Sequence, residues 1–156
     1  MAELAGNMLE PEEDTLADKY LIFNVEGESY GIEIGYVTEI INITQITKVP
    51  GLPDYLKGII NLRGSIIPVM DVRLRFKLPE REYTDRTCII IAQIDGMDVG
   101  LIVDSVSEVA TIPGGNIVPP PEINKTSNKY ISGIGMVEDK IYLLLDYQSM
   151  LIIAED

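Results

Sequence analysis

Hydrophobic and polar residues alternate along most of the chain in short runs that end at glycine, a pattern typical of β-hairpins. The first run covers residues 20–25 and returns over residues 29–34, with a turn centred on Gly27. Residues 36–41 are too few for their pattern to distinguish a short helix from a strand. Two further apolar runs lie within residues 56–69 and are separated at Arg63-Gly64, which predicts a second hairpin.

The second half of the chain follows the same order. Residues 87–94 and 99–103 form a hairpin pattern, and residues 130–145 form another. An aspartate follows the last hairpin of each half, Asp71 in the first and Asp146 in the second. Aspartate is a favoured N-cap residue, so each is expected to begin a short helix. The last helix is expected over residues 147–154.

The two halves can be aligned without internal gaps. Residues 21–40 match residues 90–109 at an offset of 69, and residues 55–71 match residues 130–146 at an offset of 75. The proline-rich segment around residues 119–121 supplies the difference. We interpret the repeat as a duplication that predicts two similar lobes of about five short strands, at residues 18–76 and 86–146. Chance similarity between two hairpin arrays is the alternative.

A duplication helps to separate structural from functional positions. Gly58 and Gly133 agree between the halves, so close approach of two backbones is the simplest account of both. Asp71 and Asp146 also agree and are interpreted as helix caps. Arg63 differs, because Glu138 stands at its place in the second half. An exposed arginine at a tight turn is either a protein contact or a solvated turn residue.

The net charge of the chain excludes some classes of binding partner. The formal net charge is −13, which argues against nucleic-acid binding and against docking on an anionic membrane surface. Residues 1–17 hold five acidic side chains and no basic one, and we expect them to form a disordered acidic tail. Residues 57–86 hold seven basic against four acidic side chains. This region either steers a protein partner or is a mixed solvated surface.

The residues that usually carry catalysis are scarce. The chain has no histidine and one cysteine, Cys88, which lies in an apolar run. A Ser-His-Asp or Cys-His site cannot be assembled from such a chain, and no metal-binding spacing is present. We therefore expect neither an enzyme nor a cofactor. No apolar run is long enough to span a membrane and no signal peptide is recognisable, so a cytoplasmic protein is expected.

Residues 49–73 carry a specific resemblance. Their centre is Gly58-Ile59-Ile60-Asn61-Leu62-Arg63-Gly64, followed by Ile67-Pro68-Val69 and Asp71-Val72-Arg73. This stretch closely resembles the signature of the CheW family. Residues 20–32 and 99–106 are also similar to that family, and the resemblance extends over residues 18–154.

The resemblance implies a fold and a role. CheW-like domains are mainly β, with two five-stranded SH3-like barrels that share a core, so we expect one such domain over residues 18–156. Family members couple methyl-accepting chemoreceptors, through their cytoplasmic tips, to the regulatory domain of the histidine kinase CheA. Residues 1–17 are too short for a kinase or receiver domain, so a stand-alone adaptor at receptor arrays is expected. A generic SH3-like peptide binder is the alternative.

The resemblance also implies receptor-binding residues, namely Val37, Glu39, Gly58 and Arg63. We expect a Glu39–Arg63 ion pair to shape a groove for a receptor helix, with apolar contact from Val37 and close approach at Gly58. Glu108 and Glu138, the matching residues of the second half, are two like charges that cannot copy the pair. The motifs do not assign kinase-contact residues.

Overall fold

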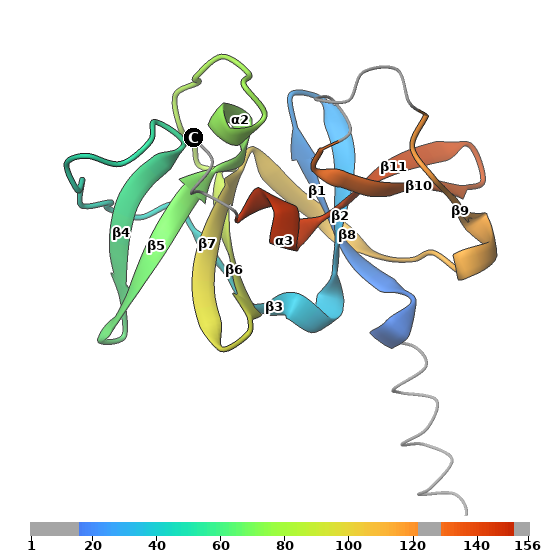
Figure 1. The fold of residues 1–156 in the computed structure, drawn as a ribbon, viewed down its shortest axis with the longest axis horizontal. Helices are drawn as coiled ribbons and strands as arrows, with labels where there is room; N and C mark the ends of the chain where they lie inside the picture. Colours follow the sequence, from blue (N-terminus) through green and yellow to red (C-terminus); the bar gives the residue numbers. More distant parts are fainter. Residues whose placement is uncertain (1–15, 122–128, 152–156) are drawn as a thin grey trace, which may run out of the picture.

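The computed structural model describes residues 16–121 and 129–151. Short strands dominate these residues, and the helices are single turns (Figure 1). The strands are β1 (Lys19–Val25), β2 (Glu28–Glu33), β3 (Val37–Asn42), β4 (Leu56–Leu62), β5 (Ser65–Asp71), β6 (Cys88–Ile94), β7 (Met97–Val103), β8 (Ser105–Thr111), β9 (Ile117–Val118), β10 (Ile131–Val137) and β11 (Lys140–Leu145). The helices are η1 (Ile34–Tyr36), α2 (Val72–Arg75), η2 (Gly114–Asn116) and α3 (Tyr147–Met150).

The strands form two sheets, and each sheet draws on both halves of the chain. One has the order β3-β6-β7-β5-β4, and we call its lobe the Arg63 lobe. The other has the order β8-β1-β2-β11-β10-β9 and builds the Glu138 lobe. The predicted lobe boundaries at 18–76 and 86–146 are therefore wrong. Each half contributes its first hairpin, β1–β2 or β6–β7, to the lobe built mainly by the other half (Figure 1).

The exchange of hairpins preserves the predicted duplication. If β1 to β5 are exchanged in order with β6, β7, β8, β10 and β11, one sheet order becomes the other, except that β9 has no counterpart in the five-stranded sheet. Equivalent hydrogen bonds also recur. The Asp71 N–H donates to the Tyr55 carbonyl at 2.7 Å, and the Asp146 N–H donates to the Tyr130 carbonyl at 2.8 Å. The two lobes are therefore the same supersecondary unit built twice.

The predicted helix caps are present in both halves. Asp71 accepts hydrogen bonds from the backbone N–H groups of Arg73 and Leu74, and Asp146 accepts one from the N–H of Ser149. Both aspartates thus satisfy donors that the first turn of a helix leaves free. Of the helix expected over 147–154, the structure shows α3, and residues 152–154 lie outside the described part. So do residues 1–15 of the expected tail, whereas residues 16–17 are helical.

Three apolar clusters stabilise the fold. The largest lies between the sheets and contains residues of both, as the expected shared core requires. Each lobe adds a smaller cluster of its own. α3 lies between the lobes, with Tyr147 and Met150 buried in the shared core (Figure 1). Burial of these side chains is the main stabilising contribution, at about 25 cal/mol per Å² of apolar surface.

Two arginines of α2 are buried, at 3% exposure each. Arg73 forms ion pairs with Glu26, in the β1–β2 turn, and with Asp104, which follows β7. Arg75 lies over the rings of Tyr55 and Tyr130, with its guanidinium carbon 4.2 and 5.0 Å from the ring centroids. α2 therefore ties together segments that are distant in the sequence and that belong to both lobes.

Candidate functional site

The predicted Glu39–Arg63 ion pair is present. Arg63 lies in the β4–β5 turn and its Nη2 atom contacts Oε1 of Glu39 on β3. Because β3 and β4 are the two outermost strands of their sheet, the pair joins the sheet's two edges. The hydrogen bond and negative charge of Glu39 raise the pKa of the Arg63 guanidinium. The Arg63 side chain is 69% exposed, so the arginine remains accessible to a partner.

The β4–β5 turn is a two-residue loop in which both central residues have positive φ. Leu62 pairs with Ser65, and the φ angles of Arg63 and Gly64 are 51° and 90°. Such turns match the right-handed twist of the flanking strands. An arginine is unusual at positive φ, because the Cβ atom crowds the backbone there. The turn holds the Arg63 side chain at the extreme tip of the lobe.

A β-bulge in β3 places Val37 and Glu39. Of the six residues that the sequence left undecided, 36–41, the first ends the 3-10 turn η1 and the other five lie in this strand. The register of β3 against β6 shifts between Val37, opposite Ala92, and Glu39, opposite Ile91. Thr38 is the extra residue, and its hydroxyl donates to the Ile91 carbonyl at 3.1 Å. Val37 consequently packs against the shared core, while Glu39 reaches the ion pair.

Gly58 is not brought to the ion pair. It lies five positions before Arg63 in β4, which corresponds to about 16 Å along an extended strand. It is buried and has a φ of 143°, and an added Cβ atom would lie 2.0 Å from the Thr47 carbonyl oxygen. Gly58 therefore permits close approach of two backbones, as the duplication predicts, and its place in the fold is not that of a surface contact.

The equivalent place in the Glu138 lobe has a different chemistry. Glu108 and Glu138 are both exposed, and Glu138 adopts the same positive φ as Arg63, at 56°. The strand register shifts at the same point of β8 as in β3, so the backbones of the two tips are alike. Two carboxylates at this tip cannot form an ion pair with each other. The tip with an arginine is thus specific to the Arg63 lobe.

Large apolar side chains are exposed at matched positions of the two lobes. Ile66 and Ile141 are equivalent and are 61% and 60% exposed. Ile40 and Val109 are also equivalent and are 42% and 49% exposed. Alternation in the sequence indicates two faces of a strand, but not that both faces would carry apolar residues. Comparison of the two halves provides the missing signal, because both expose the same positions.

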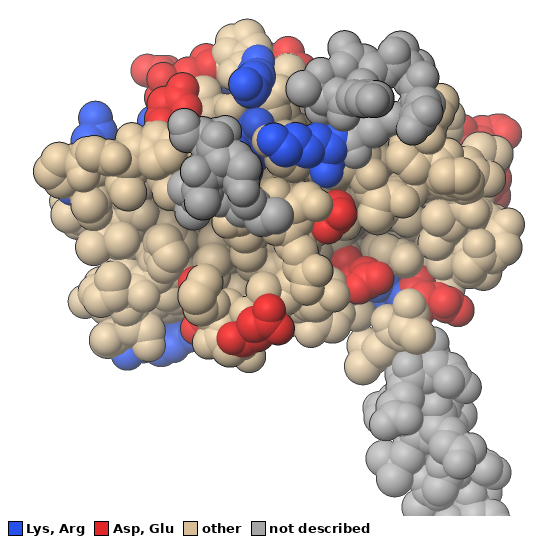
Figure 2. All heavy atoms as spheres, viewed as in Figure 1, with Lys and Arg blue, Asp and Glu red and all other residues tan. Residues whose placement is uncertain are grey.

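The basic region predicted at residues 57–86 is less extensive on the surface than in the sequence. Arg73 and Arg75 are buried in ion pairs and aromatic contacts, so they do not contribute to an outer field. Lys57 pairs with Glu80, and Arg81 lies 3.7 Å from Glu26. Figure 2 shows a few basic side chains near α2 among acidic neighbours. The surface around α2 is therefore mixed in charge.

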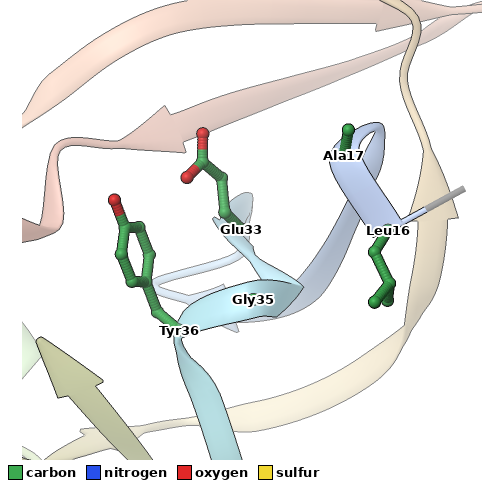
Figure 3. Close-up of a pocket in the computed structure, with 5 residues that line it drawn as sticks. All are labelled: Leu16, Ala17, Glu33, Gly35 and Tyr36. Carbon is green, nitrogen blue, oxygen red and sulfur yellow. The ribbon is translucent and has the colours of Figure 1, made fainter. Parts of the chain in front are cut away.

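A shallow open groove of about 470 Å³ lies where the described chain begins. It is lined by Leu16, Ala17, Glu33, Gly35 and Tyr36, and the Glu33 carboxylate and Tyr36 hydroxyl lie on the same side of η1 (Figure 3). The groove shares no residue with the ion pair. Within the described residues, no three His, Cys, Asp or Glu side chains gather closely enough to hold a metal ion. No helix found there is both long and apolar enough to span a membrane.

Comparison with known proteins gives a consistent answer. The sequence model of the CheW-like domain matches residues 19–155. The chain is 37% identical over 135 residues to the chemotaxis protein CheW of Bacillus subtilis, covering 86% of each chain. It is 34% identical over 139 residues to the chemotaxis protein CheW of Klebsiella aerogenes, covering 88% of this chain and 84% of that one.

A solved structure agrees with the sequence comparisons. The scaffolding protein TtCheW of Thermoanaerobacter tengcongensis superimposes with a TM-score of 0.83 at 36% identity. The match covers 89% of this chain and 95% of TtCheW. The two-lobed fold and the matching sequences agree with one another. The chain belongs to the family of CheW-like domains.

Proposed function

We propose that this chain is a non-catalytic adaptor of chemotaxis that couples methyl-accepting chemoreceptors to a CheA-type histidine kinase. The observation that carries the proposal is the Arg63–Glu39 pair, presented at the tip of one lobe only. Its relatives in Bacillus subtilis and Klebsiella aerogenes are named chemotaxis proteins, and TtCheW is described as a scaffolding protein. The adaptor acts on the cytoplasmic side, at membrane-associated receptor arrays.

The receptor side of the adaptor is the surface around the ion pair. The cytoplasmic tip of a chemoreceptor is a helical hairpin, and a helix is bound by apolar anchors flanked by polar contacts. The guanidinium of Arg63 offers hydrogen-bond donors in a planar fork. Val37, the apolar residue of the proposed surface, lies two residues before Glu39, the ion-pair partner of Arg63. Gly58 supports this surface by letting β4 approach the Thr47 segment, and not by touching the receptor.

The kinase side of the adaptor is apolar. The regulatory domain of CheA is itself a CheW-like domain, so it has the same two kinds of lobe. Ile66 and Ile141, exposed at equivalent positions, offer apolar anchors on both lobes. Contiguous exposed apolar patches mark protein–protein interaction sites, and we assign Ile66 and Ile141 to such patches. Ile66 lies opposite Asn61 beside the Arg63 turn, so Ile141, on the Glu138 lobe, is the kinase-side anchor that lies apart from the receptor side.

The generic peptide-binding function receives no support from the surface. Proline-rich peptides dock in grooves lined by aromatic side chains. The chain has 8 tyrosines, 2 phenylalanines and no tryptophan. All ten of these aromatic residues lie in the described part of the structure, and none is exposed. Their rings pack in the cores and between the lobes, so they do not form an aromatic groove on the surface.

Isothermal titration calorimetry with the two partners separately tests the proposal. The chain is titrated with the isolated CheA regulatory domain from the same organism, and with the cytoplasmic hairpin of a receptor. We expect saturable one-to-one binding to both. Arg63→Glu is expected to weaken receptor binding at least about tenfold, as loss of a central arginine contact does, and to leave kinase binding unchanged. A folded chain that binds neither partner would contradict the coupling function.

A further inference from the structure

The turn that presents Arg63 is held by a side chain from the preceding strand. The Oδ1 atom of Asn61 accepts a hydrogen bond of 2.9 Å from the backbone N–H of Gly64. That N–H lies in the two-residue loop between Leu62 and Ser65, so it has no place in the ladder between β4 and β5. Asparagine side chains commonly hold turns in this way. The hydrogen bond therefore restrains the two-residue loop to which Arg63 belongs.

Fixing this loop has a consequence for Arg63. A long side chain that is 69% exposed samples many rotamers, and a partner that orders it meets an entropic cost. The direction of the side chain depends on the backbone of its own residue, which has the uncommon φ of 51°. With the loop closed by Asn61, the Arg63 guanidinium contacts Glu39 before any partner arrives. The site is then partly organised in the free protein.

The second half of the chain shows that the Asn61 bond is not part of the common fold. Met136 stands at the position of Asn61 and has no oxygen in its side chain. The Glu138 tip is held differently, by the side-chain amide of Asn116, which donates 2.7 Å to the backbone carbonyl of Met136. This hydrogen bond holds a residue of β10 and does not involve the turn. The Glu138 lobe therefore folds without an equivalent of the Asn61 hydrogen bond on its turn.

The β3 bulge provides the contrast. It positions Glu39, yet the same register shift recurs in β8 of the other lobe, where the equivalent residues Glu108 and Glu138 have like charges and cannot pair with each other. A feature shared by both lobes is explained by the fold alone. The Asn61–Gly64 hydrogen bond occurs only where the turn carries an arginine. By this comparison, the Asn61–Gly64 hydrogen bond is a feature of the Arg63 site, whereas the β3 bulge is a feature of the barrel fold.

We propose that Asn61 is a positioning residue of the receptor site. It acts through the Gly64 N–H to hold Arg63 in its binding-competent direction, and it is not itself a receptor contact. This inference rests on the proposed function, because it assigns Asn61 a role in the same site. It predicts that removing the bond weakens receptor binding through Arg63 and leaves kinase binding unchanged.

The first part of the test measures the bond and the affinity in the full chain. Asn61→Ala is expected to speed hydrogen exchange of the Gly64 amide and to weaken binding of the receptor hairpin, each about two- to tenfold, as loss of one hydrogen bond allows. Asn61→Asp keeps an acceptor oxygen and is expected to restore both values. Asn116→Ala is the matched control, because it removes an asparagine bond at the other tip, and receptor affinity is expected to stay unchanged.

The second part asks whether Asn61 acts through Arg63. In an Arg63→Ala background, Asn61→Ala is expected to cause no further loss of receptor affinity. An equal loss in both backgrounds, or faster Gly64 exchange without a change in affinity, would overturn the inference. If Arg63→Ala itself leaves receptor affinity unchanged, the proposed receptor site fails. If Arg63→Ala weakens binding and Asn61→Ala does not, only the positioning role of Asn61 fails.

Discussion

Arg75 and Met150 occupy equivalent positions in the two halves of the chain, and the side-chain Nε of Arg75 donates a hydrogen bond of 3.0 Å to the backbone carbonyl of Met150. The rings of Tyr55 and Tyr130, also an equivalent pair, flank the same guanidinium. The contact therefore lies where the two halves meet. The duplicated halves differ there, because one position holds the arginine and the other holds the residue that it binds.

Replacing this arginine is expected to loosen the junction between the lobes. Arg75→Ala removes a buried charged hydrogen bond and two cation–π contacts, so the free energy of unfolding should fall by about 2–4 kcal/mol. Urea denaturation measures the change. The control is Arg86→Ala at an exposed position, which is expected to change stability by about 0.5 kcal/mol or less. Equal effects of the two substitutions would contradict the role of Arg75 at the junction.

Gly58 offers a test of fold against surface contact. In Gly58→Ala the new Cβ would lie 2.0 Å from the Thr47 carbonyl oxygen, at a φ of 143° that a side chain disfavours. We expect the free energy of unfolding to fall by about 3 kcal/mol or more. Gly35 has no atom within 4 Å of an added Cβ, so Gly35→Ala is the matched control and should keep wild-type stability. Thermal unfolding measures both variants. If Gly58→Ala is as stable as the wild type, the backbone contact with Thr47 is misassigned.

Two tyrosines differ in what their hydroxyl groups contact. Within the described residues the buried Tyr147 hydroxyl has no hydrogen-bond partner, and burial raises the pKa of Tyr147 above its usual value. Tyr147→Phe is expected to leave stability unchanged or to raise it by about 1 kcal/mol, since a buried unpaired hydroxyl is costly. Tyr83 donates 2.8 Å to the Asp71 carboxylate, so Tyr83→Phe should lower stability by about 1–2 kcal/mol.

Denaturation of the two variants side by side measures this difference. The result that would contradict it is the reverse order, in which Tyr147→Phe is the more destabilising variant. Such an outcome would mean that the Tyr147 hydroxyl has a partner in the folded protein.

A charge exchange between Arg63 and Glu39 separates two ways in which the pair can act. The double variant Arg63→Glu with Glu39→Arg keeps opposite charges at the same two positions, so its melting temperature should equal that of the wild type. If Arg63 contacts the receptor directly, the exchanged pair should still bind the receptor hairpin at least about tenfold more weakly. Recovery of wild-type affinity in the double variant would mean that the pair only shapes the tip and makes no directed contact.

The arrangement of the strands could be predicted only in part from the sequence. The repeat identified equivalent positions correctly, from the Asp71 and Asp146 caps to the turns. It did not reveal the exchange of the first hairpins between lobes. β1–β2 and β6–β7 have the same pattern, and neighbours in sequence usually pair in space, so local preference favoured contiguous lobes. The choice depends on contacts across the shared core, which no local pattern contains.

The candidate site could also be predicted only in part from the sequence. Glu39 and Arg63 were paired by the family resemblance, and the structure brings them together. The burial of Arg73 and Arg75 was missed, because arginines are usually exposed. One signal was available, since the second half places the apolar Met150 at the position of Arg75. The hydrogen bond of Asn61 could not be predicted, because it depends on the closure of a two-residue turn.

Simultaneous binding is the central requirement of the proposed function, because a coupling protein must hold the receptor and the kinase at once. Sedimentation velocity of a labelled receptor hairpin with the CheA regulatory domain, in the presence and absence of this chain, measures that directly. We predict that hairpin and kinase domain sediment together only when the chain is present, and that Arg63→Glu releases the hairpin while the kinase domain stays bound. If the kinase domain instead displaces the hairpin from the chain, the two surfaces overlap and the proposed coupling is contradicted.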